Sequence, residues 1–218
     1  MDPLFWRERW ENGQTGFHQA QVNVDLRALW PRVHCPPNAP VFVPLCGKSP
    51  DMVWLRAQGH PVIGIELSEL AVASFFSEQH LQPVPESSGS VPCWSAGGYE
   101  LYVGDFFDLA AAKLKSVRAV YDRAALIALP ASLRERYARH LSAILPAGCK
   151  MLLLTINYPQ EQMAGPPFAV AQSEVHALFD PAFSVRMLTT RDALLEQPRF
   201  QQRGLLRRDE QAYLLERT

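Results

Sequence analysis

This 218-residue chain lacks an excess of charge of either sign: it has 21 basic and 22 acidic residues and a formal charge of −1. A balanced chain lacks the broad positive field that favours nucleic acid, so we expect no nucleic-acid partner. Its one basic cluster is interrupted by Asp209 and Glu210, and we interpret it as a solvated surface turn. The cluster comprises Arg203, Arg207 and Arg208.

Paired cysteine motifs are also missing. The four cysteines are Cys35, Cys46, Cys93 and Cys149, with no CxxC spacing and no nearby histidine pair. This scatter argues against a zinc site and a disulfide framework, and it predicts reduced thiols without a bound metal. The start has no basic segment followed by an apolar run, and no stretch approaches the ~20 apolar residues of a membrane span. We therefore expect a soluble, cytoplasmic protein.

Apolar residues make up 48% of the chain and charged residues 20%, which is typical of a globular protein with a sizeable core. No repeat or shift in composition divides it, so we expect a single domain over residues 1–218. Continuous apolar runs, rather than alternating ones, predict strands that are covered on both faces. These runs are residues 41–45, 61–65, 100–103, 119–121, 151–156, 183–188 and 212–215.

Helix signals lie between these runs. Ser49 supplies an N-cap hydroxyl, followed by a proline at the first helical position and by Asp51 in the first turn. Ser68 similarly begins a helix that reaches about residue 79. Leucines and a tyrosine at four-residue spacing predict a helix over 132–145, and a shorter one covers 172–179.

Strands that alternate with helices predict a mainly parallel sheet with helices on both faces. No convincing helix separates the last two strands, so a terminal antiparallel pair is expected. Residues 83–98 are rich in proline, serine and glycine and are interpreted as an exposed loop.

The first strand–turn–helix, from Val41 to Gln58, lies where such sheets bind ligands, at the carboxyl end of a strand. Its turn ends in Gly-Lys-Ser like a phosphate-binding loop, but the earlier glycine of that motif is replaced by Phe42. Gly47 is the only glycine of the turn, so few backbone donors could face a diphosphate. A cofactor without phosphates fits better, although a plain tight turn explains this segment equally well.

The second strand ends at Glu66, nineteen residues after Gly47. An acid at this position commonly accepts hydrogen bonds from a ribose diol. The alternative is that Glu66 merely precedes the Ser68 helix cap. The spacing together with the strand-end position favours ribose binding.

The third strand ends with an acid and an aromatic ring, Asp105 and Phe106. Such a pair can hold an adenine, with the carboxylate near the exocyclic amine and the ring packed on the base. The next ring, Phe107, is expected in the core. Asp108 is an alternative cap for a helix over 109–114.

The fourth strand ends with Asp122 and Arg123, at the edge where cofactor and acceptor would meet. A local salt bridge between these neighbours is the structural alternative. Because of its place at the predicted site, we favour a functional role for Arg123.

The amino-terminal segment is unusually aromatic. Trp6 and Trp10 fall on one face of a helix, for which core packing is the default explanation. Because the segment precedes the first strand, it is free to fold over the ligand end of the sheet, so we predict a lid within residues 1–30. His18 could accept a proton, although a lone histidine is more often structural. The aromatic residues are Phe5, Trp6, Trp10, Phe17 and Trp30.

Together these residues resemble the thiopurine S-methyltransferase family, particularly its bacterial members. The similarity runs from residues 5–18 to the last strand and is carried by ordered motifs. Besides residues 5–18, the most specific are Val43-Pro44-Leu45-Cys46-Gly47-Lys48-Ser49, Gly59-His60, Ile63-Gly64-Ile65-Glu66-Leu67-Ser68-Glu69, Tyr121-Asp122-Arg123-Ala124-Ala125-Leu126 and Gly165-Pro166-Pro167-Phe168.

The resemblance implies the class I S-adenosylmethionine-dependent methyltransferase fold: an α/β domain with a seven-stranded, mostly parallel sheet, an antiparallel terminal strand and an N-terminal lid. It implies methyl transfer from S-adenosylmethionine to thiopurines and other aromatic or heterocyclic thiols, releasing S-adenosylhomocysteine. Family members are also associated with selenium and tellurium detoxification, so tellurite resistance is a further expectation. We expect a monomer.

The resemblance also suggests site residues. Arg123 is placed near both cofactor and acceptor sulfur and is the expected catalytic residue, while Phe17 lines the acceptor pocket. A second substrate arginine is not assigned, because the region around Arg199 departs from the family pattern. The suggested cofactor contacts are Trp10, Leu45, Glu66, Asp105, Phe106 and Arg123. Two rival interpretations are a non-catalytic S-adenosylmethionine-binding module and a nucleotide-binding protein that uses Gly47-Lys48-Ser49.

Overall fold

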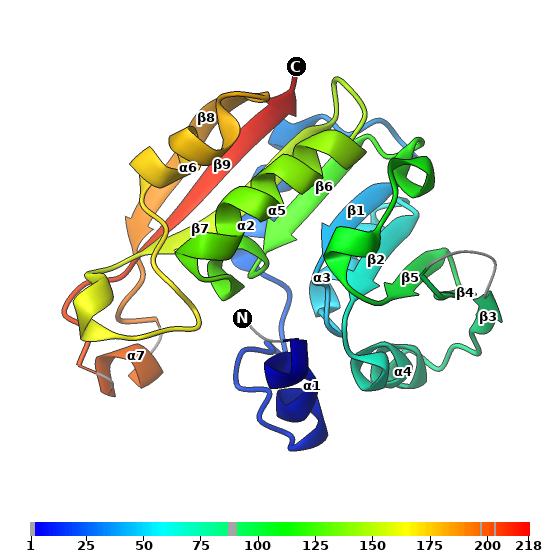
Figure 1. Cartoon of the computed structure of the whole chain (residues 1–218), viewed down its shortest axis with the longest axis horizontal. Coiled ribbons are helices and arrows are strands. Elements are labelled where there is room, and N and C mark those ends of the chain that lie inside the picture. The colour runs from blue at the N-terminus through cyan, green and yellow to red at the C-terminus, as the bar shows by residue number, and fades with distance from the viewer. Residues whose placement is uncertain (1–2, 87–90, 197, 203) are drawn as a thin grey trace.

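The computed structural model describes residues 3–86, 91–196, 198–202 and 204–218. In this part of the chain, nine strands form one sheet in the order β3-β4-β5-β2-β1-β6-β7-β9-β8 (Figure 1). The strands are β1 (Val41–Pro44), β2 (Val62–Glu66), β3 (Val84–Glu86), β4 (Cys93–Ala96), β5 (Tyr99–Val103), β6 (Ala119–Arg123), β7 (Lys150–Asn157), β8 (Phe183–Asp192) and β9 (Asp209–Arg217).

The helices alternate with these strands along most of the chain. The α-helices are α1 (Pro3–Glu11), α2 (Val24–Leu29), α3 (Pro50–Ala57), α4 (Glu69–Glu78), α5 (Ala131–Ile144), α6 (Gln172–Phe179) and α7 (Pro198–Gln202). Short 3₁₀ turns are η1 (Trp30–Val33), η2 (Phe106–Asp108), η3 (Ala111–Leu114), η4 (Leu126–Ala128) and η5 (Gln160–Gln162).

The centre of the sheet is parallel, as predicted. Strand β1 pairs in parallel with β2 and β6, and the parallel pairing continues outward to β5 and β7. Strand β9 runs antiparallel to both β7 and β8, which confirms the terminal antiparallel pair. The carboxyl ends of the five parallel strands therefore meet at one edge of the sheet.

The interpretation of residues 83–98 as a plain loop is wrong. Strand β3 pairs with β4, and β4 pairs with β5, so an antiparallel hairpin extends the expected seven strands to nine. Gly97 and Gly98, with φ of 60° and 88°, form the two-residue turn between β4 and β5. Two consecutive residues with positive φ are what such a hairpin turn requires. Pro85 is tolerated because β3 is an edge strand.

Helices cover both faces of the sheet, with α5 and α6 in front in Figure 1 and α2 and α3 behind. The predicted helix starts are confirmed: the Ser49 side chain caps α3 at the amide of Asp51, and Ser68 caps α4 at the amide of Ala71. One apolar core lies between the sheet and α5–α6, and a second lies against α2, α3 and α4. A smaller third cluster includes Ile156 and Phe200. These cores fix the strands whose ends carry the polar residues.

Helix α1 lies beyond the edge of the sheet where the parallel strands end (Figure 1). Of the residues described, none from α1 belongs to the apolar cores. A short helix, α7, separates β8 from β9, where no convincing helix signal was found in the sequence. Within the described ranges, no helix is both long and apolar enough to cross a membrane.

Candidate active site

A cavity of about 630 Å³ opens at the carboxyl ends of the parallel strands, under α1. Its volume is within the range of small-molecule sites, about 300–1,000 Å³. Side chains from five strand ends and from the amino-terminal segment surround it. The structure brings together on its wall every residue predicted for the site: Trp10, Phe17, Leu45, Glu66, Asp105, Phe106 and Arg123.

The carboxylate of Glu66 is held by the backbone at the tip of β2. One of its oxygens accepts a hydrogen bond from the amide of Gly47 at 2.8 Å, and the other from the amide of Ser68 at 2.9 Å. Glu66 is only 7% exposed, and this burial raises its pKa, while the hydrogen bonds from Ser68, Gly47 and Leu67 oppose the shift. An ionised carboxylate has about four lone-pair sites, so at least one remains for a ligand hydroxyl. Glu66 can therefore hold the amide of Ser68 at the start of α4 and still bind a ligand.

The turn after β1 is shaped by backbone conformations with positive φ. Leu45 and Gly47 have φ of 47° and 52°. A Cβ at Gly47 would stand only 3.2 Å from Cζ2 of Trp10, so glycine permits both the conformation and the close approach of the indole. Lys48 forms an ion pair with Glu78 on α4. This pairing gives Lys48 a structural partner and does not favour the nucleotide-binding interpretation.

The tip of β5 places an acid beside aromatic rings. Asp105 accepts a hydrogen bond from the amide of Phe107 at 2.9 Å and caps the η2 turn. The Phe106 ring is 4.8 Å from that of Tyr137 and is 5% exposed. The alternative role of Asp108 as a cap for residues 109–114 is wrong, since Asp108 lies inside η2 and Ala110 precedes η3.

Phe107, expected in the core, is only partly buried and also lines the cavity. The guanidinium of Arg136 lies over its ring, 3.8 Å from the ring centroid. The adenine assignment therefore has two aromatic rings available, and Asp105 lines the cavity beside them.

At the end of β6, Arg123 does not pair with its neighbour Asp122. Its Nη1 instead donates to Asp51 Oδ2 at 3.2 Å, across the turn on helix α3. The same oxygen accepts from the hydroxyl of Tyr121 at 2.9 Å. The local salt-bridge alternative is therefore wrong, because the two side chains of adjacent strand residues point to opposite faces of the sheet.

Asp122 lies beneath the site and is fully buried. It accepts hydrogen bonds from the hydroxyl of Tyr137 at 2.7 Å and from the amide of Leu126 at 3.3 Å. Burial raises the pKa of Asp122 to about 6, and the hydrogen bond from Tyr137 opposes this shift. This pair supports the turn that follows Arg123.

The amino-terminal aromatic residues form a cluster over the cavity. Phe17 contacts Trp6 and Trp10 edge to face, with ring centroids 5.4 and 5.5 Å apart. Trp10 is 8% exposed, whereas Phe17 is 36% exposed, as expected for a ring that lines an open site. His18 lies beside them; its pKa is lowered by burial and then by the charges of Lys48 and Arg123. His18 also lines the cavity.

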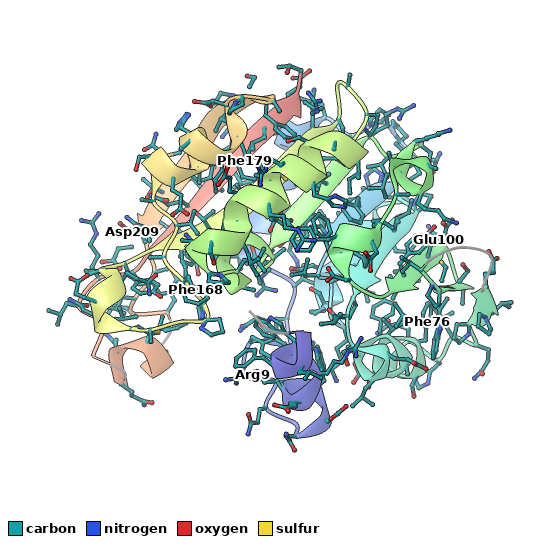
Figure 2. The ribbon with its side chains drawn as sticks, in the orientation of Figure 1. Arg9, Phe76, Glu100, Phe168, Phe179 and Asp209 are labelled. Carbon is teal, nitrogen blue, oxygen red and sulfur yellow. The ribbon has the colours of Figure 1, made fainter. Side chains whose placement is uncertain are left out.

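The loop after β7 closes a second side. Pro166 and Pro167 line the cavity, and the Tyr158 hydroxyl donates to the carbonyl of Pro167 at 2.6 Å. The bonds that precede both prolines are cis. In Figure 2, Phe168 of this loop lies above and to the left of Arg9 on α1.

The far end of the cavity contains charged residues that the sequence did not predict for the site. Arg208 was expected on a solvated turn, but its side chain is 7% exposed and donates to Glu210 at 2.9 Å. Its guanidinium also lies 4.8 Å from the ring centroid of Phe200. Arg207 is exposed, as predicted, whereas Arg203 lies outside the described residues, as does the side chain of Arg199.

The residues present fit a nucleoside cofactor without phosphates. A buried, backbone-oriented carboxylate faces the cavity next to a glycine turn, and aromatic rings lie one strand further along. Across residues 3–86, 91–196, 198–202 and 204–218, no three histidine, cysteine or acidic side chains gather as a metal-binding group. All four cysteines are free thiols.

This fold and site define an S-adenosylmethionine-dependent methyltransferase of class I. The structure of an S-adenosylmethionine-dependent methyltransferase from Anabaena variabilis is similar with a TM-score of 0.68 at 14% identity, covering 99% of this chain and 95% of that one, which supports the fold. The family model for thiopurine S-methyltransferase matches residues 1–218. The chain belongs to the thiopurine S-methyltransferase family, which confirms the resemblance found in the sequence.

Bacterial relatives agree with this membership along their whole length. The thiopurine S-methyltransferase of Azotobacter vinelandii is 51% identical over 217 residues, covering 100% of both chains. That of Pseudomonas fluorescens is 49% identical over 213 residues, covering 98% of both.

Proposed function

We propose that this enzyme transfers the methyl group of S-adenosylmethionine to the sulfur of thiopurines and other aromatic or heterocyclic thiols. The observation that carries the proposal is that one cavity contains both the backbone-oriented carboxylate of Glu66 and the guanidinium of Arg123. The first suits the ribose of the cofactor and the second suits an anionic acceptor. Transfer of a group between two ligands requires that both bind side by side in one cavity.

The cofactor contacts follow from this arrangement. Glu66 binds the ribose hydroxyls with the lone pairs that Gly47 and Ser68 leave free. Leu45 and Trp10 line the cavity beside the glycine turn and hold the methionine part. Asp105 and Phe106 are next to the adenine, and Arg123 contacts the cofactor from the β6 side.

When bound, S-adenosylmethionine supplies an electrophilic sulfonium methyl for an in-line displacement. Arg123 favours the thiolate form of the acceptor by its positive charge, directly or through water. Phe17 packs against the acceptor ring. The amino-terminal lid and the loop at Pro166 and Pro167 exclude water and hold the nucleophile in line with the methyl.

Selenium and tellurium species are further acceptors that we propose for the same site, with tellurite resistance as the physiological consequence. Their anions are soft nucleophiles. For this displacement the protein needs only to align the reactants, stabilise charge and exclude water. A competition assay with 6-mercaptopurine, thiophenol and reduced selenite- and tellurite-derived species tests this acceptor range. Methylation of the thiols alone would remove the chalcogen proposal, and methylation of none would overturn the function.

We also propose that the protein acts as a monomer in the cytoplasm. The cavity is lined by α1 and the β7–α6 loop of the same chain, so a second copy is not needed to complete it. Free thiols suit a reducing compartment. Light scattering of the purified protein and cell fractionation test these two statements.

A further inference from the structure

Asp51 is a buried carboxylate that does not line the cavity but forms a hydrogen bond with Arg123, which does. It lies in the first turn of α3, is 0% exposed and accepts from three donors on different parts of the chain. These donors are Arg123 Nη1 at 3.2 Å, the Tyr121 hydroxyl at 2.9 Å and the backbone amide of Asn23 at 2.7 Å. In the described part of the chain it is the one acid that forms an ion pair with Arg123.

This contact restricts the orientation of the arginine. The Arg123 side chain is 21% exposed, so its guanidinium has one edge on Asp51 and remains accessible to the cavity. A guanidinium is planar, and one charge-assisted hydrogen bond to a buried carboxylate limits the directions in which its other donors can point. The oxygen that holds Arg123 is itself held by Tyr121, whose ring is 1% exposed. A rigid support of this kind is what a precisely oriented cationic group needs.

The third donor connects the same carboxylate to the amino-terminal segment. Asn23 donates its amide to Asp51 Oδ1, and its own side chain accepts from the amides of Asp25 and Leu26 to cap α2. The chain that leads from the aromatic lid into the domain is thus fixed at the residue that also holds Arg123.

We propose that Asp51 is a positioning residue for methyl transfer, which aims the Arg123 guanidinium at the acceptor. The inference rests on the proposed role of Arg123 in acceptor binding. It assigns no contact between Asp51 and either ligand, because Asp51 does not line the cavity. The effect assigned to Asp51 is the one exerted through its contact with Arg123, and its bond to the Asn23 amide is a separate structural contact.

A double-mutant cycle tests this inference at saturating S-adenosylmethionine, with an aryl thiol as acceptor. Asp51→Asn keeps the size of the side chain but removes its charge. Its NH2 group cannot accept a hydrogen bond, so it must face either the Arg123–Tyr121 donors or the Asn23 amide and leave that side without an acceptor. We expect kcat/KM for the thiol to fall at least ~10-fold in Asp51→Asn, a loss typical of a misaligned catalytic group. In the Arg123→Ala background the same substitution is expected to change kcat/KM less than ~2-fold.

Asp180→Asn, at the exposed C-cap of α6, is the matched control and should retain wild-type kinetics. Additive losses in the double variant would overturn the inference, because they would show an effect that does not pass through Arg123. A normal kcat/KM in Asp51→Asn would overturn it too, if Arg123→Ala is impaired. If Arg123→Ala itself has wild-type kinetics, the failure lies in the proposed role of Arg123. Thermal melting of each variant identifies losses that come from unfolding.

Discussion

Glu66 and Gly47 are joined across the ends of two neighbouring strands by a hydrogen bond of 2.8 Å, from the glycine amide to the carboxylate Oε2. The bond orients the acid of β2 toward the turn that follows β1, and Trp10 closes over that turn. The glycine, the acid and the lid helix therefore form one unit, although 56 residues separate Trp10 from Glu66 in the sequence.

Replacing Glu66 with glutamine should weaken cofactor binding more than it changes the fold. Hydrogen bonds to a charged group contribute about 1.5–3 kcal/mol, so the dissociation constant of S-adenosylhomocysteine should rise roughly 10- to 100-fold. Calorimetric titration measures this directly. Glu69→Gln, three residues further on at an exposed position, is the control; equal affinity in both variants would remove the ribose role.

The same carboxylate makes binding pH-dependent. Because burial raises the pKa of Glu66, the binding-competent ionised form is lost as the pH falls through a value above the ordinary 4.5. Affinity should therefore decline on acidification in the wild type and stay level in Glu66→Gln.

Arg123→Ala should lower methyl transfer while the protein stays folded. Loss of a group that stabilises charge in the transition state commonly reduces kcat about 10²-fold. Because Arg123 favours the acceptor thiolate, the loss should be largest below the pKa of the free thiol and smaller above it, where the thiolate forms unaided. The measurement is kcat/KM against pH for one aryl thiol, with Arg139→Ala on the exposed face of α5 as control. Superimposable profiles for Arg123→Ala and wild type would exclude a chemical role.

Deleting residues 1–20 should open the site without unfolding the domain. The deletion removes Trp10, Phe17 and His18 but keeps Asn23, which holds Asp51 and caps α2. Trp10 is buried, but no described residue of α1 belongs to the apolar clusters around the sheet, so the melting temperature should change by only a few degrees. We expect at least a ~10-fold loss of kcat/KM from water entry and lost contacts. Full activity in the truncated protein would show that the segment is not a lid.

Asp122→Asn should change how stability depends on pH. Burial raises the pKa of Asp122 from 3.8 to about 6, so the folded protein binds this proton more tightly than the unfolded chain. Stability of the wild type is therefore lost as the pH rises from about 4 to 6, by up to about 3 kcal/mol for a shift of roughly two units. The asparagine variant should lack this loss.

Urea unfolding at pH 4, 5, 6 and 7 checks that expectation, with Asp180→Asn as an exposed control. Parallel stability curves for wild type and Asp122→Asn would show that Asp122 does not titrate in this range.

The fold was predictable where its signals are local. Ser49 and Ser68 cap the helices that they were expected to begin, because a hydroxyl at an N-cap acts within three residues. The hairpin at β3 and β4 was missed because its prolines and serines indicate a loop, although Gly97-Gly98 is a hairpin signal.

The site was predictable in its membership and much less so in its contacts. Strand-end position placed Glu66 and Arg123 at one edge, since parallel strands end together. The partner of Arg123 was not predictable, because Asp51 is 72 residues away in the sequence. Its position there indicates only an acid in the first turn of a helix. Arg208 was misassigned for a related reason: Phe200 and Glu210 cover a charge that the local sequence presents as exposed.

The most direct test of the central claim follows the methyl group itself. The protein is incubated with 6-mercaptopurine and S-adenosylmethionine labelled with ¹³C at the methyl, and the product is identified by NMR. We predict a single S-methyl resonance that grows in a one-to-one ratio with S-adenosylhomocysteine. An N-methyl product, or binding of S-adenosylhomocysteine without any transfer, would contradict the account.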